Sequence, residues 1–326
     1  MPACSGIMRF SHDDLSESNM QTSRLPVSRA SSKSPLDSPV FSRIVLGLWR
    51  LGSWNMSAQQ RLAFLEQSLE LGITTTDHAD IYGDYQAEAL FGEALALKPS
   101  VRSQIEIVSK CGIKLVSPGR PAHTVQHYDT SRAHIIASAE KSLQNLHTDY
   151  LDLLLIHRPD PLMDADEIAE AFTSLQQSGK VKHFGVSNFT TSQFDLLASR
   201  FPLVTNQIEF SVLHMAPLDD GTLDQCQRLS LSPMIWSALA GGRLFSDDTE
   251  QGLRVRAALE KIAADLGVSI STVAIAWILQ HPSRPLALTG SGRIEAVREA
   301  VAATAVTLTR EQWFSVWIAS AGRNVA

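Results

Sequence analysis

The sequence predicts an α/β fold, a closed (β/α)8 barrel of the TIM type with an extra helix near the C-terminus. Short apolar runs that suit buried strands alternate with longer amphipathic segments that suit helices over most of the 326 residues. There are eight such runs, the number that closes this barrel. Neither a G-x-G-x-x-G nor a phosphate-loop motif follows the first run, which argues against an open nucleotide-binding sheet.

The N-terminal residues differ from the rest of the chain. Residues 1–39 are rich in serine and show neither helical nor strand periodicity, so we expect a disordered leader before a single barrel domain at 40–326. Scattered arginine and serine are also found in organellar transit peptides. Such peptides avoid acidic residues, however, and Asp13, Asp14 and Glu17 occur here.

The composition excludes several classes of protein. A hydrophobic content of 44% can form a large core, and a net charge of −6 without a basic patch argues against a nucleic-acid partner. No apolar run approaches the roughly 18 residues of a membrane span. The three cysteines, Cys4, Cys111 and Cys226, are scattered and odd in number, which fits a reducing compartment. We therefore expect a cytoplasmic protein with no membrane association.

The eight apolar runs are the predicted strands of the barrel. The longest, at 151–157, is nearly continuous in leucine and isoleucine, as a sheet covered on both faces requires. The predicted strands are Ile44–Leu48, Ile73–Asp77, Ile105–Lys110, Leu151–His157, His183–Ser187, Thr205–Glu209, Pro233–Trp236 and Leu286–Thr289.

Start signals mark several helices between these strands. Ser57, Asp164 and Thr190 each stand three residues before a glutamate or glutamine, the spacing of a capping box. Two helices, at 254–266 and 269–281, fit the seventh crossover. A further helix at 309–321 would pack outside or under the barrel.

The carboxyl ends of the strands should carry the chemistry. Each polar side chain there has a structural alternative, because an aspartate can cap a loop, a lysine can be solvated and a histidine can be a satisfied core residue. Their convergence on one rim favours a shared site. The ends carry Asp77, Lys110, His157, Ser187 with Asn188, Glu209 and Trp236, and Tyr82 follows Asp77 by five residues.

Four of these residues suit one reaction. Tyr82 is a weak acid, and an adjacent Lys110 ammonium would lower its pKa. Asp77 would keep Lys110 protonated, and His157 would hydrogen-bond a substrate carbonyl. Tyr82 could then give a proton to a developing alkoxide. The hydride that such a reduction needs must come from a cofactor.

The chain from about Val40 to its end resembles the aldo-keto reductases. The motifs that carry the resemblance are Asp77-x4-Tyr82, Ser109–Gly112, Leu153–Asp160, Gly185–Phe189 and Asn206-Gln207, in the family's order. Three other stretches look closest to the bacterial YdhF-like oxidoreductase branch: Met163–Asp166, Asp220–Gln225 and Gly241–Phe245.

The resemblance implies reduction of an aldehyde or ketone by NADPH, which becomes NADP+, with Tyr82 as general acid, Lys110 and Asp77 tuning it, and His157 orienting the carbonyl. Ser187, Asn188 and Gln207 match residues that hold the nicotinamide carboxamide. Trp236 replaces a tyrosine that stacks on the nicotinamide ring. The full implied set of cofactor residues is Gly47, Asp77, Ser187, Asn188, Gln207, Trp236, Ser237, Leu239, Gly241, Arg243, Ser291, Gly292, Arg293 and Glu299.

The distal part of the nucleotide would bind after the last strand. Ser291 and Arg293 precede a helix that starts at Ile294, where a 2'-phosphate could bind. Ala296 and Ala300 replace an arginine and an asparagine that are common in the family. A preference for NADPH would therefore depend on Ser291 and Arg293.

The carbonyl substrate would be bordered by Trp49, Trp54 and Tyr128 if the fold is as expected. The histidines at 123, 127 and 134 do not form a convincing metal site, because their segment is not predicted to be helical, and we expect no metal.

Two other functions remain open from the sequence. The chain could be a non-catalytic NADPH-binding regulatory subunit, although Tyr82 and Lys110 are both present. It could also be a Schiff-base aldolase that uses Lys110, but an aspartate partner keeps a lysine protonated and poorly nucleophilic.

Overall fold

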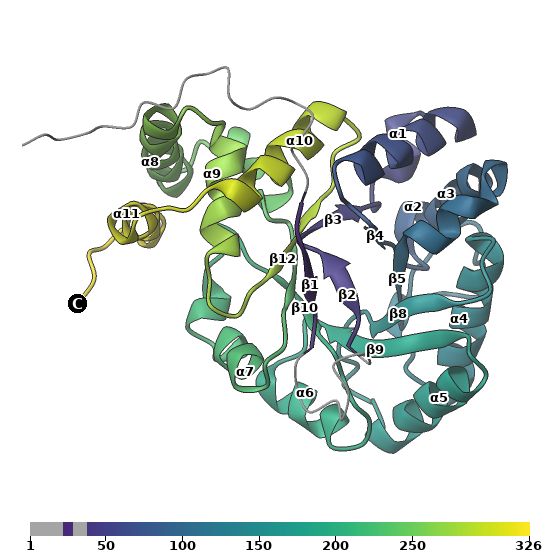
Figure 1. Ribbon diagram of the computed structural model, residues 1–326. Helices are drawn as coiled ribbons and strands as arrows, with labels where there is room; N and C mark the ends of the chain where they lie inside the picture. The colour runs from purple at the N-terminus through teal and green to yellow at the C-terminus, as the bar shows by residue number, and fades with distance from the viewer. Residues whose placement is uncertain (1–21, 29–37) are drawn as a thin grey trace, which may run out of the picture.

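The computed structural model describes residues 22–28 and 38–326 and contains the predicted barrel (Figure 1). Every neighbouring pair in the barrel is parallel, and β10 and β9 close it in the order β10-β11-β12-β3-β4-β5-β8-β9. The strands are β3 (Ile44–Gly47), β4 (Thr75–Asp77), β5 (Glu106–Cys111), β8 (Leu151–Ile156), β9 (Val181–Ser187), β10 (Asn206–Glu209), β11 (Met234–Trp236) and β12 (Leu286–Thr289).

All eight predicted strands are confirmed, with ends that differ by two residues or fewer. β9 begins two residues earlier than predicted, at Val181. The exposed Lys182 interrupts the apolar pattern there, and its ammonium lies 3.9 Å from the centre of the Tyr150 ring. A charged residue that packs on an aromatic ring can therefore belong to a strand although it breaks the apolar pattern of the sequence.

The predicted N-caps of four helices are also confirmed, but the helix expected at 254–266 begins earlier, at Glu250, with Thr249 as its N-cap. Ser57, Thr190 and Thr309 form capping boxes, and Asp164 accepts from two backbone N–H groups. The helices are α1 (Ala58–Glu70), α2 (Tyr82–Tyr85), α3 (Ala87–Leu97), α4 (Arg132–Asn145), α5 (Ala165–Gln177), α6 (Thr191–Ala198), α7 (Thr222–Arg228), α8 (Glu250–Leu266), α9 (Ile270–Leu279), α10 (Ile294–Ala302) and α11 (Arg310–Ala321). Short 3-10 turns are η3 (Leu51–Trp54), η4 (Pro99–Gln104), η5 (Ala216–Leu218), η6 (Ala240–Phe245) and η7 (Ala303–Ala305).

The expectation of a disordered leader over residues 1–39 is wrong for residues 22–28. β1 (Arg24–Pro26) pairs antiparallel with β2 (Val40–Ser42), which leads directly into β3. Leu25, Val27 and Phe41 are buried against apolar side chains from the inside of the barrel. The hairpin thus covers the amino-terminal end of the barrel, opposite the strand ends that carry the polar residues. The rest of the expected leader, 1–21 and 29–37, lies outside the described residues.

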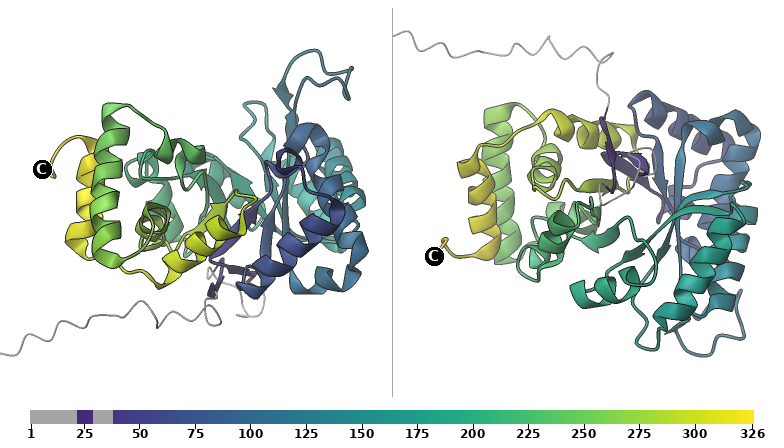
Figure 2. Two further views of the ribbon diagram at one scale, coloured as in Figure 1. Left: turned by 90° about the horizontal axis from the view of Figure 1, so that it is seen from above. Right: turned by 60° about the horizontal axis from the view of Figure 1, so that its bottom comes forward.

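The extra helix α11 packs on the outside of the barrel against α8 and α9 (Figure 2). Trp313 of α11 stacks on Trp277 of α9 with ring centres 4.7 Å apart and planes 10° apart. Each indole N–H also donates to the backbone carbonyl of the other tryptophan, at 2.9 and 3.0 Å. This reciprocal pair fixes α11 to the barrel wall. A second hairpin, β6 (Ile113–Lys114) with β7 (His127–Tyr128), extends from the end of β5.

In the described ranges no single helix is both long and apolar enough to cross a bilayer. Only α8 and α9 taken together reach the required length, and they meet at a bend of 97°.

Candidate active site

Three of the four predicted catalytic residues form one buried cluster at the carboxyl ends of β4 and β5. The Lys110 ammonium donates to Asp77 Oδ2 at 2.7 Å, to the His78 carbonyl at 2.7 Å and to the Tyr82 hydroxyl at 3.1 Å. The side chains of Lys110 and Asp77 are 0% and 2% exposed. The three donors of the ammonium are thus all used, and one of them points at the phenol oxygen.

His157, at the end of β8, completes the cluster. Its ring lies edge-on to Tyr82 with ring centres 5.8 Å apart. His157 Nδ1 is buried and has no partner among the described residues. The four residues therefore converge as predicted, because the ends of parallel strands meet at one rim.

The charges in the cluster are set by burial and by the ion pair. Burial opposes the charged form of Lys110, but Asp77 and Tyr82 outweigh it and raise the pKa of Lys110 above its ordinary value. Burial, followed by the nearby Lys110 and Arg158, holds the pKa of His157 well below its usual range. At neutral pH the site therefore contains a lysine cation and a neutral imidazole.

Lys110 lowers the pKa of Tyr82 as expected, but the net shift of that pKa is upward. Burial raises the pKa of Tyr82, and the Lys110 ammonium offsets this only in part. A phenolate at this largely desolvated position would lose part of its hydration, and Asp77 also disfavours it. Tyr82 is therefore a protonated phenol at neutral pH, the form that a proton donor needs.

Gln207 connects the cluster to the neighbouring strands. Its Nε2 donates to Asp77 Oδ1 at 2.7 Å, so both carboxylate oxygens of Asp77 are engaged. Next to it, Ser187 Oγ donates to the Gln207 carbonyl and accepts from Asn188 Nδ2. Asn188 Oδ1 in turn accepts from the Trp236 indole at 3.0 Å. The residues predicted to hold nicotinamide thus form one hydrogen-bonded row from β9 to β11.

The loop after Trp236 has strained backbone. Ser237 and Ala240 have φ values of 53° and 52°, and Asn188 has 59°, although none is a glycine. Such conformations concentrate at functional sites. The loop also contains Leu239, Gly241 and Arg243. Arg50, from the loop after β3, donates to the Gly241 carbonyl at 2.9 Å, so the loop is tied across the rim.

The glycine at the end of β3 allows a close approach between backbones. A side chain at Gly47 would lie 3.2 Å from the Thr289 carbonyl of β12. The segment from Gly290 to Arg293 follows at once. Arg293 is the N-cap of α10 but provides no capping side chain, and its own N–H donates to Ser291 Oγ. Three of the predicted distal residues, Ser291, Gly292 and Arg293, therefore lie at a helix N-terminus that no side chain caps.

Several predicted residues are not brought to the catalytic cluster. Glu299 accepts from Ser269 Oγ at 3.1 Å on the outer side of α10, where it ties α10 to α9. Trp54 packs edge-on against Phe64, and its ring occupies the place of a side chain at Gly292. Trp49 is 58% exposed and Tyr128 is 40% exposed on the β7 hairpin. Within the described ranges no group of three or more histidine, cysteine or acidic side chains could hold a metal ion.

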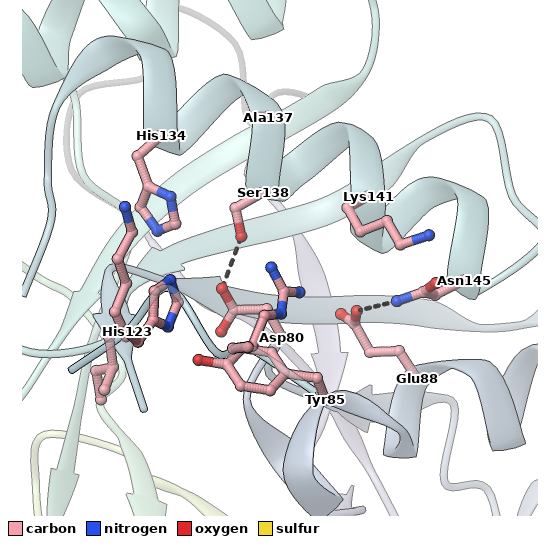
Figure 3. A pocket seen from close by; sticks show the side chains of 12 residues that line it. Asp80, Tyr85, Glu88, His123, His134, Ala137, Ser138, Lys141 and Asn145 are labelled. Atoms are coloured by element: carbon pink, nitrogen blue, oxygen red, sulfur yellow. Dashed lines mark hydrogen bonds between the residues drawn. The ribbon is translucent and has the colours of Figure 1, made fainter. Parts of the chain in front are cut away.

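A separate cavity of about 440 Å³ lies behind the loop that carries Tyr82, between α3, α4 and the β6–β7 hairpin. Figure 3 shows Asp80 facing it, with Ser138 Oγ donating to Asp80 Oδ2 at 2.7 Å. Asp80 Oδ1 is buried and has no partner among the described residues, and burial raises the pKa of Asp80 to about 7. Glu88 lies on the same wall and accepts from Ser109 and Asn145.

Sequence reasoning missed three contacts. The Asp77–Gln207 bond joins residues 130 positions apart on strands that are not neighbours, so no local signal marks it. Arg50 lies in an exposed loop. Arg158 had a signal that was not used, because it directly follows His157; its guanidinium carbon lies 5.4 Å from the centre of the Trp236 ring.

Comparison with known proteins agrees with this geometry. The aldo/keto reductase family model matches residues 43–318. The oxidoreductase YdhF of Escherichia coli (strain K12) is 58% identical over 88% of this chain and 96% of its own length. The 6-dehydroglucose reductase of Agrobacterium fabrum is 45% identical over 88% and 96%. The aldo-keto reductase of Klebsiella pneumoniae in complex with NADPH superposes with a TM-score of 0.73 and 27% identity over 90% of this chain and 94% of that one. The chain belongs to the aldo/keto reductase family of NAD(P)H-dependent oxidoreductases.

Proposed function

We propose that the protein reduces an aldehyde or ketone to the alcohol with NADPH, and that Tyr82 is the proton donor. The observation that carries the proposal is the buried Tyr82–Lys110–Asp77 hydrogen-bond chain beside a neutral His157. A carbonyl oxygen placed between the Tyr82 hydroxyl and the imidazole could accept from both. The proposal therefore rests on the geometry of the site as well as on family membership.

In the proposed reaction NADPH supplies the hydride to the carbonyl carbon. Tyr82 donates its hydroxyl proton to the carbonyl oxygen as negative charge develops there. Lys110, which stays protonated, stabilises the phenolate that remains. Asp77 fixes the position of Lys110, and His157 orients the carbonyl by a hydrogen bond. The raised pKa of Lys110 also makes a Schiff-base aldolase a poor alternative.

The residues present fit the cofactor. Gln207 uses its amide nitrogen on Asp77, which leaves its oxygen to accept from a carboxamide, and Asn188 and Ser187 lie beside it. Trp236 offers a flat indole face that Asn188 holds in position. The N-terminus of α10, which no side chain caps, would bind the 2'-phosphate together with Arg293.

The relatives support an aldehyde as the substrate. The 45% identical relative is named for reduction of 6-dehydroglucose, a sugar aldehyde. Of the proposed substrate-bordering residues, Trp49 and Tyr128 are exposed and could contact a small ligand at the mouth of the barrel. We place the protein in the cytoplasm because Cys111 and Cys226 are buried free thiols, as expected in a reducing compartment.

The test is a fluorescence titration of the full chain with NADPH and NADH, followed by addition of a panel of aldehydes. Because Trp236 would lie against the nicotinamide, binding should quench its emission. We expect NADPH binding and carbonyl-dependent oxidation in the wild type. Tyr82→Phe should bind NADPH as tightly but lose most of its kcat, by about 10²–10⁴-fold.

A different result would change the assignment. If Tyr82→Phe reduces carbonyls at the wild-type rate, Tyr82 is not the acid. If the wild type binds NADPH tightly but turns over no carbonyl, a non-catalytic regulatory subunit becomes the better description.

A further inference from the structure

Arg158 lies at the rim of the catalytic cluster and has no polar partner in the described part of the chain. It follows His157 directly after β8 and is half-buried. Its one defined contact is with the face of Trp236, at 5.4 Å. A guanidinium carries five donors, and leaving them unused in a partly desolvated position costs free energy unless a ligand engages them.

Five other arginines that are buried or half-buried are hydrogen-bonded within the described part of the chain. Each donates to a carboxylate or a backbone carbonyl, so the fold normally satisfies a half-buried guanidinium. These arginines are Arg43, Arg61, Arg102, Arg254 and Arg256. Arg158, next to the proposed catalytic histidine, forms no such hydrogen bond in the described part of the chain.

The charge of Arg158 reaches the groups that would handle the carbonyl oxygen. After burial and Lys110, it contributes to the low pKa of His157, and it opposes the burial-driven rise in the pKa of Tyr82. Its guanidinium extends from the end of β8 to the aromatic residue at the end of β11. Trp236 is itself held by Asn188, so the guanidinium rests on a fixed surface.

We propose that Arg158 selects the substrate by binding an oxygen acceptor on the carbon next to the reacting carbonyl. This inference rests on the proposed reductase function. A hydroxyl or a carboxylate at that carbon would accept from the guanidinium while the carbonyl oxygen accepts from Tyr82 and His157. The site would therefore favour 2-hydroxyaldehydes or 2-oxo acids over simple aldehydes of the same length.

The test compares kcat/KM for matched pairs with NADPH: D-glyceraldehyde against propanal, and glyoxylate against acetaldehyde. The wild type should prefer at least one oxygen-bearing member. In Arg158→Met, which keeps the approximate length of the side chain, the ratio of kcat/KM between the oxygen-bearing substrate and its simple partner should fall by about tenfold or more. Arg158→Lys should keep part of the preference for glyoxylate, because lysine retains the positive charge but cannot form the paired hydrogen bonds of a guanidinium with a carboxylate. The pair that loses more shows whether the hydroxyl or the carboxylate is the natural acceptor.

Arg323→Met is the matched control. Arg323 follows α11 on the outside of the barrel, and its guanidinium carbon lies 5.4 Å from the centre of the Trp317 ring. Its replacement should leave the kcat/KM ratio of both substrate pairs unchanged. If Arg158→Met reduces all four substrates with unchanged kcat/KM ratios within each pair, Arg158 does not select the substrate. The proposed reductase function would still stand. An equal loss for both members of each pair, with weaker NADPH binding, would show that Arg158 only supports Trp236. No turnover of any carbonyl by the wild type would refute both proposals.

Discussion

The Asp77–Lys110 ion pair is completely enclosed, and this makes its two members mutually dependent. Removal of one partner from a buried pair leaves an uncompensated charge, which costs about 3–5 kcal/mol. In this site Gln207 also engages Asp77, but an amide dipole cannot neutralise a carboxylate. The pair therefore has a structural consequence as well as its proposed role in tuning Tyr82.

We expect Lys110→Met to lower both the stability and the activity. The free energy of unfolding in urea should fall by about 3–5 kcal/mol, because Asp77 stays buried without its cation. The kcat for carbonyl reduction should fall by about 10²–10⁴-fold, because the phenolate of Tyr82 loses its stabilising charge.

A double variant, Asp77→Asn with Lys110→Met, separates the two effects. It should regain much of the lost stability, since no charge is then buried, but none of the activity. A wild-type pH profile of kcat in Lys110→Met would show that this lysine does not control the acid.

Asp80, behind the catalytic loop, should make the stability depend on pH. Burial raises its pKa from an ordinary 3.8 to about 7, so between these values the folded chain holds a proton that the unfolded chain releases. The stabilising contribution of the protonated form is complete below about pH 4 and is lost as the pH rises to about 7. The effect is worth roughly 1.4 kcal/mol for each unit of the shift.

Asp80→Asn imitates the protonated carboxyl, so the variant should be more stable than the wild type above pH 7 and equal to it near pH 4. Urea unfolding at both pH values measures this difference. Asp84→Asn, at an exposed neighbour, leaves Asp80 in place and should match the stability of the wild type at both pH values. If Asp80→Asn is less stable at pH 8, Asp80 is ionised there and paired in a way that offsets its burial.

The meeting of Asp77, Lys110, Tyr82 and His157 could be predicted from the sequence, because the topology of a parallel barrel alone brings strand ends together. The individual side-chain pairs that form across the mouth of the barrel could not be predicted. The Asp77–Gln207 bond and the Arg158–Trp236 contact depend on strand register and rotamers, which periodicity does not encode. The net direction of the Tyr82 pKa shift could not be predicted either, since it depends on how far folding removes the phenol from water.

The helices show the same division between local and long-range information. Capping boxes at Ser57, Thr190 and Thr309 were predictable because all their bonds lie within four residues. The β1–β2 hairpin was not, because its strands have three residues each and join segments 16 positions apart. Strands this short are stabilised by packing on the amino-terminal end of the barrel, and three residues are too few to show an alternating pattern in the sequence.

The attachment of α11 should depend on one tryptophan more than on its neighbours. Trp313→Ala removes the stacking on Trp277 and the indole bond from Trp313 to the Trp277 carbonyl, and we expect a loss of about 2–4 kcal/mol in the free energy of unfolding. Trp317→Ala is the control, since Trp317 is also half-buried but forms no indole hydrogen bond in the described structure. A larger loss for Trp317 would contradict the importance of the stacked pair. Activity should survive in both variants, because α11 lies on the outer wall.

At the scale of the whole molecule, loops that follow different strands are joined to one another along one side of the barrel rim. Arg50 holds the loop after β11, and Trp54 packs over Gly292 next to the N-terminus of α10. A dinucleotide bound along this rim would contact segments from β3, β11 and β12 at once. Binding should therefore be coupled to global stability, because a ligand that binds only the folded state raises the free energy of unfolding.

The last prediction uses this coupling to test cofactor choice without relying on turnover. At a concentration of about 100 times its dissociation constant, NADPH should stabilise the wild type by about 2.7 kcal/mol, measured as a rise in Tm. Arg293→Met should weaken NADPH binding by about tenfold or more and leave NADH binding unchanged, because only NADPH carries the 2'-phosphate. Arg298→Met is the matched control: it lies on the same helix, is also exposed, and sits a turn further from the N-terminus. An equal loss for NADPH and NADH in Arg293→Met would mean that Arg293 supports the segment rather than the phosphate. Equal stabilisation of the wild type by NADPH and NADH at the same concentration would mean that the N-terminus of α10 does not discriminate between them.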